Sequence, residues 1–242
     1  MARVAVVGAG VMGLASARAL RRAGHEVVVH ERFALGHDRG SSHGCSRIFR
    51  LAYAEPYWVR LAQEALAGWR ELEAEAGEEL LRLDGMLEVV TALEQSSAAG
   101  LDACGVPWQR LEGAEAERRF PVKVAAPAFA VLQPEAGIVL ADRALAAFAR
   151  GLEIREGSAV ESVDELDVDV VVVAAGAWVN DLVRPPLDVR ITRETVCYFA
   201  IAGGRPVPAV VAFKPDTHGH LFYALPDPVH GLKVGAHHEG RE

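Results

Sequence analysis

The sequence predicts an α/β protein in which a domain built on a parallel sheet interleaves with an α+β domain built on an antiparallel sheet. Two apolar runs, Arg3–Val7 and residues 169–176, are typical of buried parallel strands. A mixed segment separates them, and short strand patterns punctuated by proline and glycine follow the second run. Two discontinuous domains give this order of elements.

A glycine-rich turn follows the first predicted strand directly. Gly8, Gly10 and Gly13 form a GxGxxG motif that opens a predicted helix ending near Ala23. Gly8 permits the tight turn, Gly10 lets the backbone approach a pyrophosphate, and Gly13 lets the helix pack closely on the strand. The helix N-terminus offers N–H groups and a partial positive charge to phosphates.

The second predicted strand, over residues 25–30, is followed by an acid. Glu31 lies 18 residues after Gly13, where its carboxylate can accept hydrogen bonds from a ribose diol and repels a 2′-phosphate. The alternative is a glycine-rich turn that packs well but binds no nucleotide, and the strand–turn–helix context argues against it. FAD and NAD proteins share the fingerprint. The motif therefore predicts a Rossmann-like FAD/NAD(P)-binding domain and leaves the choice of cofactor open.

The remaining elements follow from periodicity and helix breakers. Residues 33–47 are rich in Gly, Ser and His without periodicity, which predicts a long functional loop. Pro56 opens a helix with an apolar stripe that should be buried: Trp58, Leu61, Ala62, Ala65, Leu66, Trp69 and Leu72. Two short helices are expected within 94–120, and one over 143–150 capped by Asp142. Strands are expected over 85–92, 129–132, 152–155, 159–163, 195–202, 207–213, 220–225 and 232–236.

Composition and charge narrow the class of protein. The 242 residues are 51% hydrophobic and 24% charged, as in ordinary globular proteins. A formal net charge of −8 disfavours nucleic acid and anionic membranes as partners. Cys45, Cys104 and Cys197 have no paired spacing, which favours a reduced, cytoplasmic setting. The longest aliphatic run, Val170–Ala175, is too short to span a membrane, and no cleavable signal is expected before Arg3–Val7.

Several segments, taken in chain order, resemble one family. The loop GSSHGCSRIFRLAY over residues 40–53 resembles the segment after the second strand in the monomeric sarcosine oxidase and N-methyltryptophan oxidase family of D-amino-acid-oxidase-like flavoproteins. Further agreement comes from QPEAG (133–137), VVAAGAW (172–178), LFYALP (221–226) and GLKVGAH (231–237). The resemblance spans essentially the whole chain.

This resemblance implies a cofactor and a division of the chain. FAD is the expected cofactor. The FAD-binding domain should comprise residues 1–83 and 138–184, and the substrate domain residues 85–137 and 185–242. The implied reaction is oxidation of a secondary amino acid, N-methylated or cyclic, with hydride transfer to the flavin. Hydrolysis of the imine and reoxidation of the flavin by O2, giving H2O2, would complete it.

The expected partners are therefore a small amino acid and O2, with no implied oligomeric state. Two alternatives stay open. The first is another flavoenzyme of the same family, a glycine or D-amino-acid oxidase or a dehydrogenase. The second is a non-catalytic nucleotide-binding fragment.

Three basic residues are implied to act on substrate and oxygen. Arg50 matches the arginine that clamps the substrate carboxylate, which a guanidinium can bind bidentately. Arg47 matches an arginine near the flavin, and Lys233 matches the lysine that promotes oxygen reduction. The alternatives without a catalytic role are a surface position for Arg50, an ordinary salt bridge for Arg47 and protection of a strand edge for Lys233.

His43, Tyr223 and His237 align with active-site positions of the family, although a lone histidine is more often structural. Trp178 is expected in the core of the cofactor domain. The implied cofactor-binding set is Gly8, Gly10, Val11, Met12, Gly13, Glu31, Arg32, Ser41, Arg47, Gly176 and Trp178. No metal site is expected, because no acid or cysteine at ligand spacing accompanies His218, His220, His237 and His238.

The sequence departs from the family pattern in two respects. Ser42 and Cys45 replace a histidine and an acid, which weakens sarcosine as the specific substrate. The chain stops at Glu242, before the segment in which family members carry the cysteine that binds FAD covalently, so covalent attachment is not assigned. We therefore expect an interrupted chain with exposed sheet edges and apolar surface. Whether such a chain is active alone stays open.

Overall fold

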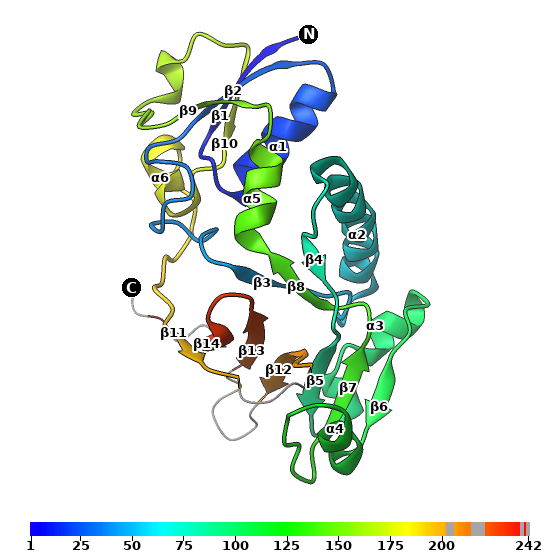
Figure 1. Ribbon diagram of the computed structural model, residues 1–242. Coiled ribbons are helices and arrows are strands. Elements are labelled where there is room, and N and C mark those ends of the chain that lie inside the picture. The colour runs from blue at the N-terminus through cyan, green and yellow to red at the C-terminus, as the bar shows by residue number, and fades with distance from the viewer. Residues whose placement is uncertain (202–205, 214–220, 238–239, 241–242) are drawn as a thin grey trace. The chain divides into compact units, whose positions relative to one another are not determined.

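The computed structural model describes residues 1–201, 206–213, 221–237 and 240. The chain divides into two compact units (Figure 1). Unit 1 comprises Met1–Gly44 and Ala141–Ile191, and unit 2 comprises Cys45–Leu140 and Thr192–Glu242. Both units draw on two separate stretches of the chain, so the interleaved α/β organisation predicted from the sequence is confirmed.

Unit 1 contains a four-stranded parallel sheet in the order β10–β1–β2–β9. The strands are β1 (Arg3–Val7), β2 (Glu26–His30), β9 (Glu153–Arg155) and β10 (Val170–Val173). Helices α1 (Val11–Arg22) and α5 (Ala141–Ala149) lie side by side and pack on this sheet (Figure 1). A 3-10 helix over Gly176–Trp178 and α6 (Val179–Leu182) follow β10.

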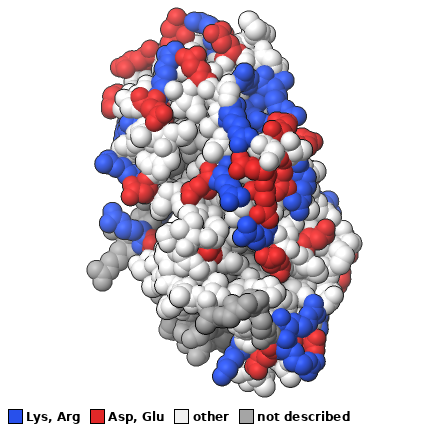
Figure 2. All heavy atoms as spheres, viewed as in Figure 1, with Lys and Arg blue, Asp and Glu red and all other residues white. Residues whose placement is uncertain are grey.

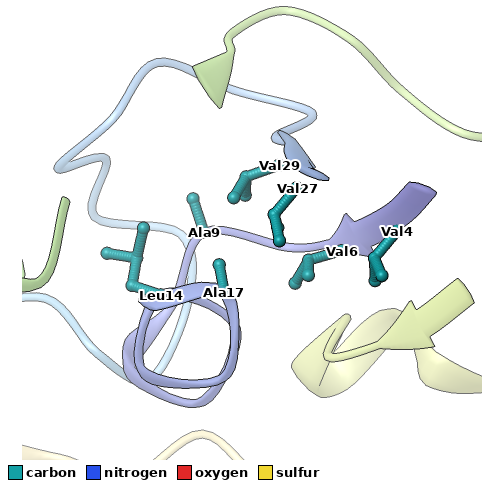
Figure 3. Close-up of a cluster of buried hydrophobic side chains, with 7 residues drawn as sticks. All are labelled: Val4, Val6, Ala9, Leu14, Ala17, Val27 and Val29. Atoms are coloured by element: carbon teal, nitrogen blue, oxygen red, sulfur yellow. The ribbon is translucent and has the colours of Figure 1, made fainter. Parts of the chain in front are cut away.

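The core of unit 1 lies between this sheet and α1. Its buried side chains come from two strands, the glycine turn and one helix face: Val4, Val6, Ala9, Leu14, Ala17, Val27 and Val29 (Figure 3). Leu14 and Ala17 are three residues apart and therefore share a face of the helix. Each buried valine or leucine contributes about 1.5–3 kcal/mol through removal of apolar surface from water. This packing fixes the start of α1 against the ends of β1 and β2.

Unit 2 contains a seven-stranded mixed sheet in the order β11–β14–β13–β12–β5–β7–β6. The strands are β5 (Met86–Val90), β6 (Gln109–Leu111), β7 (Phe129–Gln133), β11 (Val196–Phe199), β12 (Ala209–Phe213), β13 (Leu221–Asp227) and β14 (Gly231–His237). All its pairs are antiparallel except β12 with β5. The predicted antiparallel sheet is therefore present with one parallel pair.

A second sheet in unit 2 has three strands in the order β3–β8–β4. They are β3 (Ser46–Phe49), β4 (Leu81–Arg82) and β8 (Gly137–Leu140). The helices of this unit are α2 (Pro56–Ala76), a 3-10 helix over Leu93–Gln95, α3 (Ala98–Ala103) and α4 (Gly113–Arg119). These elements place β3 beside β13, which matters for the buried lysine below.

Several predicted elements need correction. Strands β3, β4, β6 and β8 were not expected, because their segments lack apolar alternation and become strands by pairing with distant partners. The strand predicted over 159–163 is wrong, and a 3-10 helix over Val163–Glu165 occurs at its end instead. Asp142 lies within the first turn of α5 and does not precede it as a cap.

Helix α2 buries a narrower face than predicted. Ala62 and Leu72 are buried together with Val59, whereas Trp58 and Leu61 are 46% and 45% exposed. The other members of the predicted stripe are exposed (Ala65) or half-buried (Leu66 and Trp69). Helical periodicity identifies the apolar positions, but the neighbouring elements decide which of them are covered.

Strands β10 and β11 form sheet edges and expose apolar side chains. The prediction that β10 is fully buried is wrong: Val170 is 47% exposed and the other residues of the strand are half-buried. All four residues of β11 are exposed, including Tyr198 and Phe199. The exposed edges and apolar surface expected from the sequence are therefore observed at both strands.

The unit boundaries differ from the predicted domain boundaries at three segments: residues 45–83 and 138–140 lie in unit 2, and residues 185–191 lie in unit 1. Residues 45–83 belong to unit 2, because β3 and β4 pair with β8. The assignment of one domain to FAD and the other to substrate stays a proposal.

Acidic and basic side chains are interspersed on the face shown in Figure 2. Among the described residues, none of the helices combines the length and the hydropathy that crossing a lipid bilayer requires. No disulfide links Cys45, Cys104 or Cys197.

Candidate active site

Unit 1 contains a cavity of about 660 Å3 at the carboxyl ends of three parallel strands. Gly8 follows β1, Glu31 follows β2 and Ala174 follows β10, and all three line the cavity. Open parallel sheets bind their ligands at this edge, and the volume is typical of small-molecule sites. The predicted residues in its wall are Gly8, Gly10, Val11, Met12, Glu31, Arg32, Ser41, His43, Gly176 and Trp178.

The glycine turn has the geometry that the fingerprint requires. Gly8 has a φ of +106°, and a Cβ there would lie 2.4 Å from the carbonyl oxygen of Ala174. A Cβ on Gly13 would lie 1.8 Å from the carbonyl oxygen of Gly8, far inside van der Waals contact. Because only glycine fits both positions, α1 begins directly against β1 and its first residues lie in the cavity wall.

The N-terminus of α1 is suited to an anionic ligand. Gly10 is its N-cap, and no acidic side chain lies in the first turn. The Val11 N–H donates to Ser42 Oγ at 3.1 Å, so a residue from the following loop caps this helix. Ser42 was noted in the sequence only as a departure from the family pattern. The helix dipole places a partial positive charge at the cavity, which fits the diphosphate of a dinucleotide.

Glu31 is 5% exposed and joins the glycine turn to the end of β2. Its Oε2 accepts from the Ala9 N–H at 2.8 Å, and its Oε1 accepts from the Phe33 N–H at 2.9 Å. His37 Nε2 lies 3.4 Å from Oε1. A carboxylate oxygen can accept more than one hydrogen bond, so Glu31 keeps capacity for a ribose hydroxyl. The structure thus adds a role in shaping the turn to the one predicted.

Glu31→Gln should weaken FAD binding roughly 10- to 100-fold. The amide replaces one acceptor oxygen with a donor that faces a main-chain N–H of Ala9 or Phe33. Fluorescence titration of the FAD-free protein with FAD measures the affinity. Glu26→Gln removes an exposed carboxylate at the start of β2 and should leave the affinity unchanged. Equal affinities of the wild type and Glu31→Gln would contradict the role of Glu31.

One wall of the cavity is aromatic. Trp178 is half-buried and contacts Phe33 edge-on, with ring centroids 5.5 Å apart. The Arg32 guanidinium lies 5.9 Å from the Trp178 ring and 3.9 Å from the Asp181 carboxylate. The expectation that Trp178 lies in the core is therefore wrong, because its ring lines the cavity. It presents an apolar surface beside a cation.

His30 and Ser158 line the cavity without having been predicted. His30 Nδ1 and Ser158 Oγ are 3.0 Å apart. Burial, and to a lesser extent Arg155, lowers the pKa of His30 below its usual value. Ser158 reaches the wall after β9, which pairs with β2. No local pattern could identify it, because this contact joins residues 128 positions apart.

The buried lysine of unit 2 lies on an interior strand. Strand β14 is flanked by β11 and β13, so Lys233 does not protect a sheet edge. Lys233 is 5% exposed, and its Nζ donates to the Ser46 carbonyl oxygen at 2.6 Å. Burial, and then Arg47, lowers the pKa of Lys233 to about 8, while Asp227 and Cys45 raise it. The ammonium is therefore mostly charged at neutral pH and loses its proton as pH rises through about 8.

Two further predicted residues of unit 2 lie near this lysine. Arg47 donates to the same Ser46 carbonyl oxygen at 2.8 Å, so two cations meet at one acceptor. Tyr223 is half-buried, and burial raises its pKa while Arg47 lowers it. Arg47, Lys233 and Tyr223 thus form one electrostatic group around the start of β3.

The remaining residues predicted to lie in the active site are Arg50, His237 and His43. The Arg50 guanidinium lies 4.7 Å from the Tyr53 ring. His237 is exposed at the end of β14, where it pairs with Leu221. His43 belongs to unit 1, where its Nδ1 is hydrogen-bonded to the Gly40 carbonyl oxygen.

Asp227 and Ser46 complete the lysine network and were not predicted. Cys45, Asp227 and His230 carry possible ligand atoms within 4.8 Å of one another. The Asp227 oxygens already accept three protein hydrogen bonds, and the positive charges of Lys233 and Arg47 oppose a further cation. We therefore interpret the cluster as a hydrogen-bond network. His218, His220 and His238 lie outside the described residues.

Comparison with known proteins agrees with this arrangement. The profile of the DAO family, described as FAD dependent oxidoreductase, matches residues 3–242. The chain is 30% identical to peroxisomal sarcosine oxidase of Mus musculus, over 97% of the chain and 68% of that protein. It is 31% identical to peroxisomal sarcosine oxidase of Homo sapiens, over 95% of the chain and 64% of that protein. N-methyl-L-tryptophan oxidase of Yersinia pestis (strain Pestoides F) is 30% identical, with coverages of 98% and 70%.

Solved structures give the same result. NikD, an unusual amino acid oxidase essential for nikkomycin biosynthesis, superimposes with a TM-score of 0.79 at 29% identity, over 99% of the chain and 70% of that structure. L-Proline dehydrogenase from P. horikoshii has a TM-score of 0.77 at 22% identity, with coverages of 96% and 68%, which shows the fold alone. The chain spans about two thirds of the length of these relatives. Since the family profile covers nearly all of it, this chain belongs to the DAO family of FAD-dependent oxidoreductases.

Proposed function

We propose that this chain supplies the FAD-binding unit and the substrate- and oxygen-facing residues of an oxidase of secondary amino acids, N-methylated or cyclic. When bound, FAD takes a hydride equivalent from the substrate carbon and is reoxidised by O2, which yields H2O2. The imine product hydrolyses in water. Similarity to sarcosine and N-methyl-L-tryptophan oxidases supports this substrate class. The observation that carries the proposal is the buried ammonium of Lys233, which is fixed by a hydrogen bond to the Ser46 carbonyl oxygen.

Lys233 is the group that promotes reaction with oxygen in this proposal. Burying an ammonium costs several kcal/mol unless it is compensated, so its position deep in the sheet needs a reason. A fixed positive charge stabilises the negative charge that oxygen gains as it is reduced. The hydrogen bond to Ser46 fixes the direction of the ammonium. An ammonium has three donors, so this bond does not exhaust it.

The residues of the unit 1 cavity fit FAD. The turn from Gly8 to Gly13 leaves no space for side chains against β1, and the α1 N-terminus is suited to the diphosphate. Glu31 would hold the ribose hydroxyls, and Trp178 with Arg32 would contact the cofactor along the aromatic wall. These residues would bind and orient the cofactor. The cytoplasmic location expected from the cysteine spacing is part of the same proposal.

Arg50 is proposed to bind the substrate carboxylate. Arg50→Lys should raise KM roughly 10- to 100-fold, because an ammonium cannot reproduce the bidentate geometry of a guanidinium. Steady-state peroxide production against amine concentration measures KM and kcat. Arg60→Lys changes an exposed arginine of α2 and serves as the matched control. An unchanged KM in Arg50→Lys would remove Arg50 from the substrate site.

The function is tested with the FAD-loaded protein and a panel of amines. Sarcosine, N-methyl-L-tryptophan and L-proline represent secondary amines, and glycine and D-alanine represent primary amines. Mixing without oxygen should bleach the flavin absorption with a secondary amine, and admission of air should restore it with formation of H2O2. Bleaching by primary amines alone would indicate a glycine or D-amino-acid oxidase. Bleaching that air does not reverse would select a dehydrogenase, and no bleaching by any amine would reject amine oxidation.

A further inference from the structure

We propose that Asp227 is a positioning residue for Lys233. Its carboxylate fixes Ser46, whose carbonyl oxygen accepts a hydrogen bond from the Lys233 ammonium, and it keeps a compensating negative charge near this ammonium. This inference rests on the proposed role of Lys233 for its functional consequence. Its structural part can be tested separately.

The anchoring is a chain of short hydrogen bonds between buried groups. Asp227 Oδ2 accepts from Ser46 Oγ at 2.8 Å, and the Ser46 carbonyl oxygen accepts from Lys233 Nζ at 2.6 Å. Ser46 is 0% exposed, and Asp227 and Lys233 are each 5% exposed. The carboxylate of Asp227 thus fixes the side chain of Ser46, and the backbone carbonyl oxygen of Ser46 accepts from the Lys233 ammonium. Displacement of Ser46 would move the acceptor of Lys233 with it.

The carboxylate itself is held by the turn between β13 and β14. Asp227 Oδ1 accepts from the backbone N–H of Val229 at 3.1 Å and of His230 at 2.9 Å. Burial alone would raise the pKa of Asp227, but the hydrogen bonds from His230, Ser46 and Val229 lower it below its usual value. Asp227 is therefore ionised at neutral pH. A residue that only capped this turn would not need the additional bond from Ser46.

The charges around Lys233 give the carboxylate a second effect. Arg47 on β3 lowers the pKa of the lysine, whereas Asp227 on β13 and Cys45 before β3 raise it. Tyr198, opposite Lys233 on β11, has a pKa raised first by burial and then by Asp227. Tyr223 and His230 also belong to this cluster: Arg47 acts on Tyr223, and Asp227 is close to His230. Removal of the negative charge of Asp227 should therefore release the lysine proton at lower pH.

Glu88 provides a matched comparison within the same unit. It is 6% exposed, and its Oε2 accepts hydrogen bonds from the backbone and hydroxyl of Ser97. Glu88 and Asp227 are the buried carboxylates in the described part of unit 2. Of the two, Asp227 accepts a hydrogen bond from Ser46 of the lysine network. Glu88→Gln therefore removes a buried carboxylate without removing the proposed partner.

The first experiment follows the titration of Lys233 by NMR in protein labelled with ¹³C-lysine. The chain has three lysines, Lys123, Lys214 and Lys233, so Lys233→Met assigns the signal. The midpoint should lie near pH 8 in the wild type and fall by roughly one unit in Asp227→Asn. Ser46→Ala, which breaks the link and keeps the carboxylate, should shift it less. Glu88→Gln should not shift it.

The second experiment measures reoxidation of the reduced flavin by O2 against pH in the same FAD-loaded variants. The fall in rate at high pH should move to lower pH in Asp227→Asn, while anaerobic reduction by substrate changes little. An unmoved Lys233 midpoint in Asp227→Asn overturns the proposal and leaves Asp227 as a turn cap. A moved midpoint with an unmoved rate profile supports the positioning role and rejects the proposed oxygen role of Lys233. If Asp227→Asn does not fold, the Ser46→Ala midpoint decides, and no shift there overturns the proposal.

Discussion

Gly13→Ala should abolish FAD binding and destabilise unit 1. The added methyl group would lie 1.8 Å from the Gly8 carbonyl oxygen, which is backbone and cannot rotate away. Helix α1 must therefore move from β1, and the glycine turn that lines the cavity must move with it. We expect a loss of about 3 kcal/mol in the free energy of unfolding. Thermal unfolding and FAD titration measure the two effects.

Two glycines of unit 2 separate the cofactor effect from a general effect of alanine. Gly68 lies in α2 with nothing within 4 Å of an added Cβ, so Gly68→Ala should stabilise the helix by about 0.5–1 kcal/mol. A Cβ on Gly100 of α3 would lie 2.1 Å from the Tyr53 carbonyl oxygen. Gly100→Ala should therefore destabilise the protein, although Gly100 does not belong to the cofactor cavity. Full FAD affinity in Gly13→Ala would contradict the assignment of the fingerprint.

Lys233→Met should slow reoxidation of the reduced flavin by O2 roughly 10²- to 10³-fold. Methionine has a similar length without the charge, so it removes the stabilisation of negative charge on oxygen. Anaerobic reduction of the flavin by substrate should change little, because the lysine acts on the second half-reaction. Stopped-flow absorption of the flavin measures the two half-reactions separately.

The pH dependence provides a further readout for this variant. The wild-type rate with oxygen should fall as pH rises through about 8, because the ammonium loses its proton there. Lys233→Met should show no such fall over the same range. Its stability should be nearly unchanged, because Arg47 still donates to the Ser46 carbonyl oxygen. Lys123→Met, at an exposed position, is the matched control. Wild-type reoxidation in Lys233→Met would reject the proposed oxygen site.

Local sequence pattern was sufficient for the βαβ start of unit 1. The apolar run Arg3–Val7, the three glycines and Glu31 lie within 31 consecutive residues, and the close approach of Gly13 to Gly8 and the hydrogen bond from Ala9 to Glu31 fall within that segment. The spacing of such residues directly reflects the turn and helix that they form. Motif order along the chain also indicated the family that the profile match establishes.

Sequence pattern failed where pairing between distant segments decides the outcome. The run over residues 169–176 has the composition of a buried strand, yet β10 lies at an edge because only β1 pairs with it in the described sheet. Strand β3 has no apolar alternation, and the short apolar run of β8 does not reveal its partner; the two strands form because they pair with each other. Apolar composition reports that a segment can be buried, while the number of neighbours determines whether it is.

The amino-acid sequence by itself therefore determined the parallel-sheet unit, the position of the glycine turn and the acid that closes it. The tertiary structure alone decided the environment of Lys233. Its acceptor Ser46 is 187 positions away, and the bond from Ser46 to Asp227 spans 181 positions. Nothing in the local sequence distinguishes a buried lysine from one that protects an edge, because burial and charge compensation come from strands that meet only in the folded sheet.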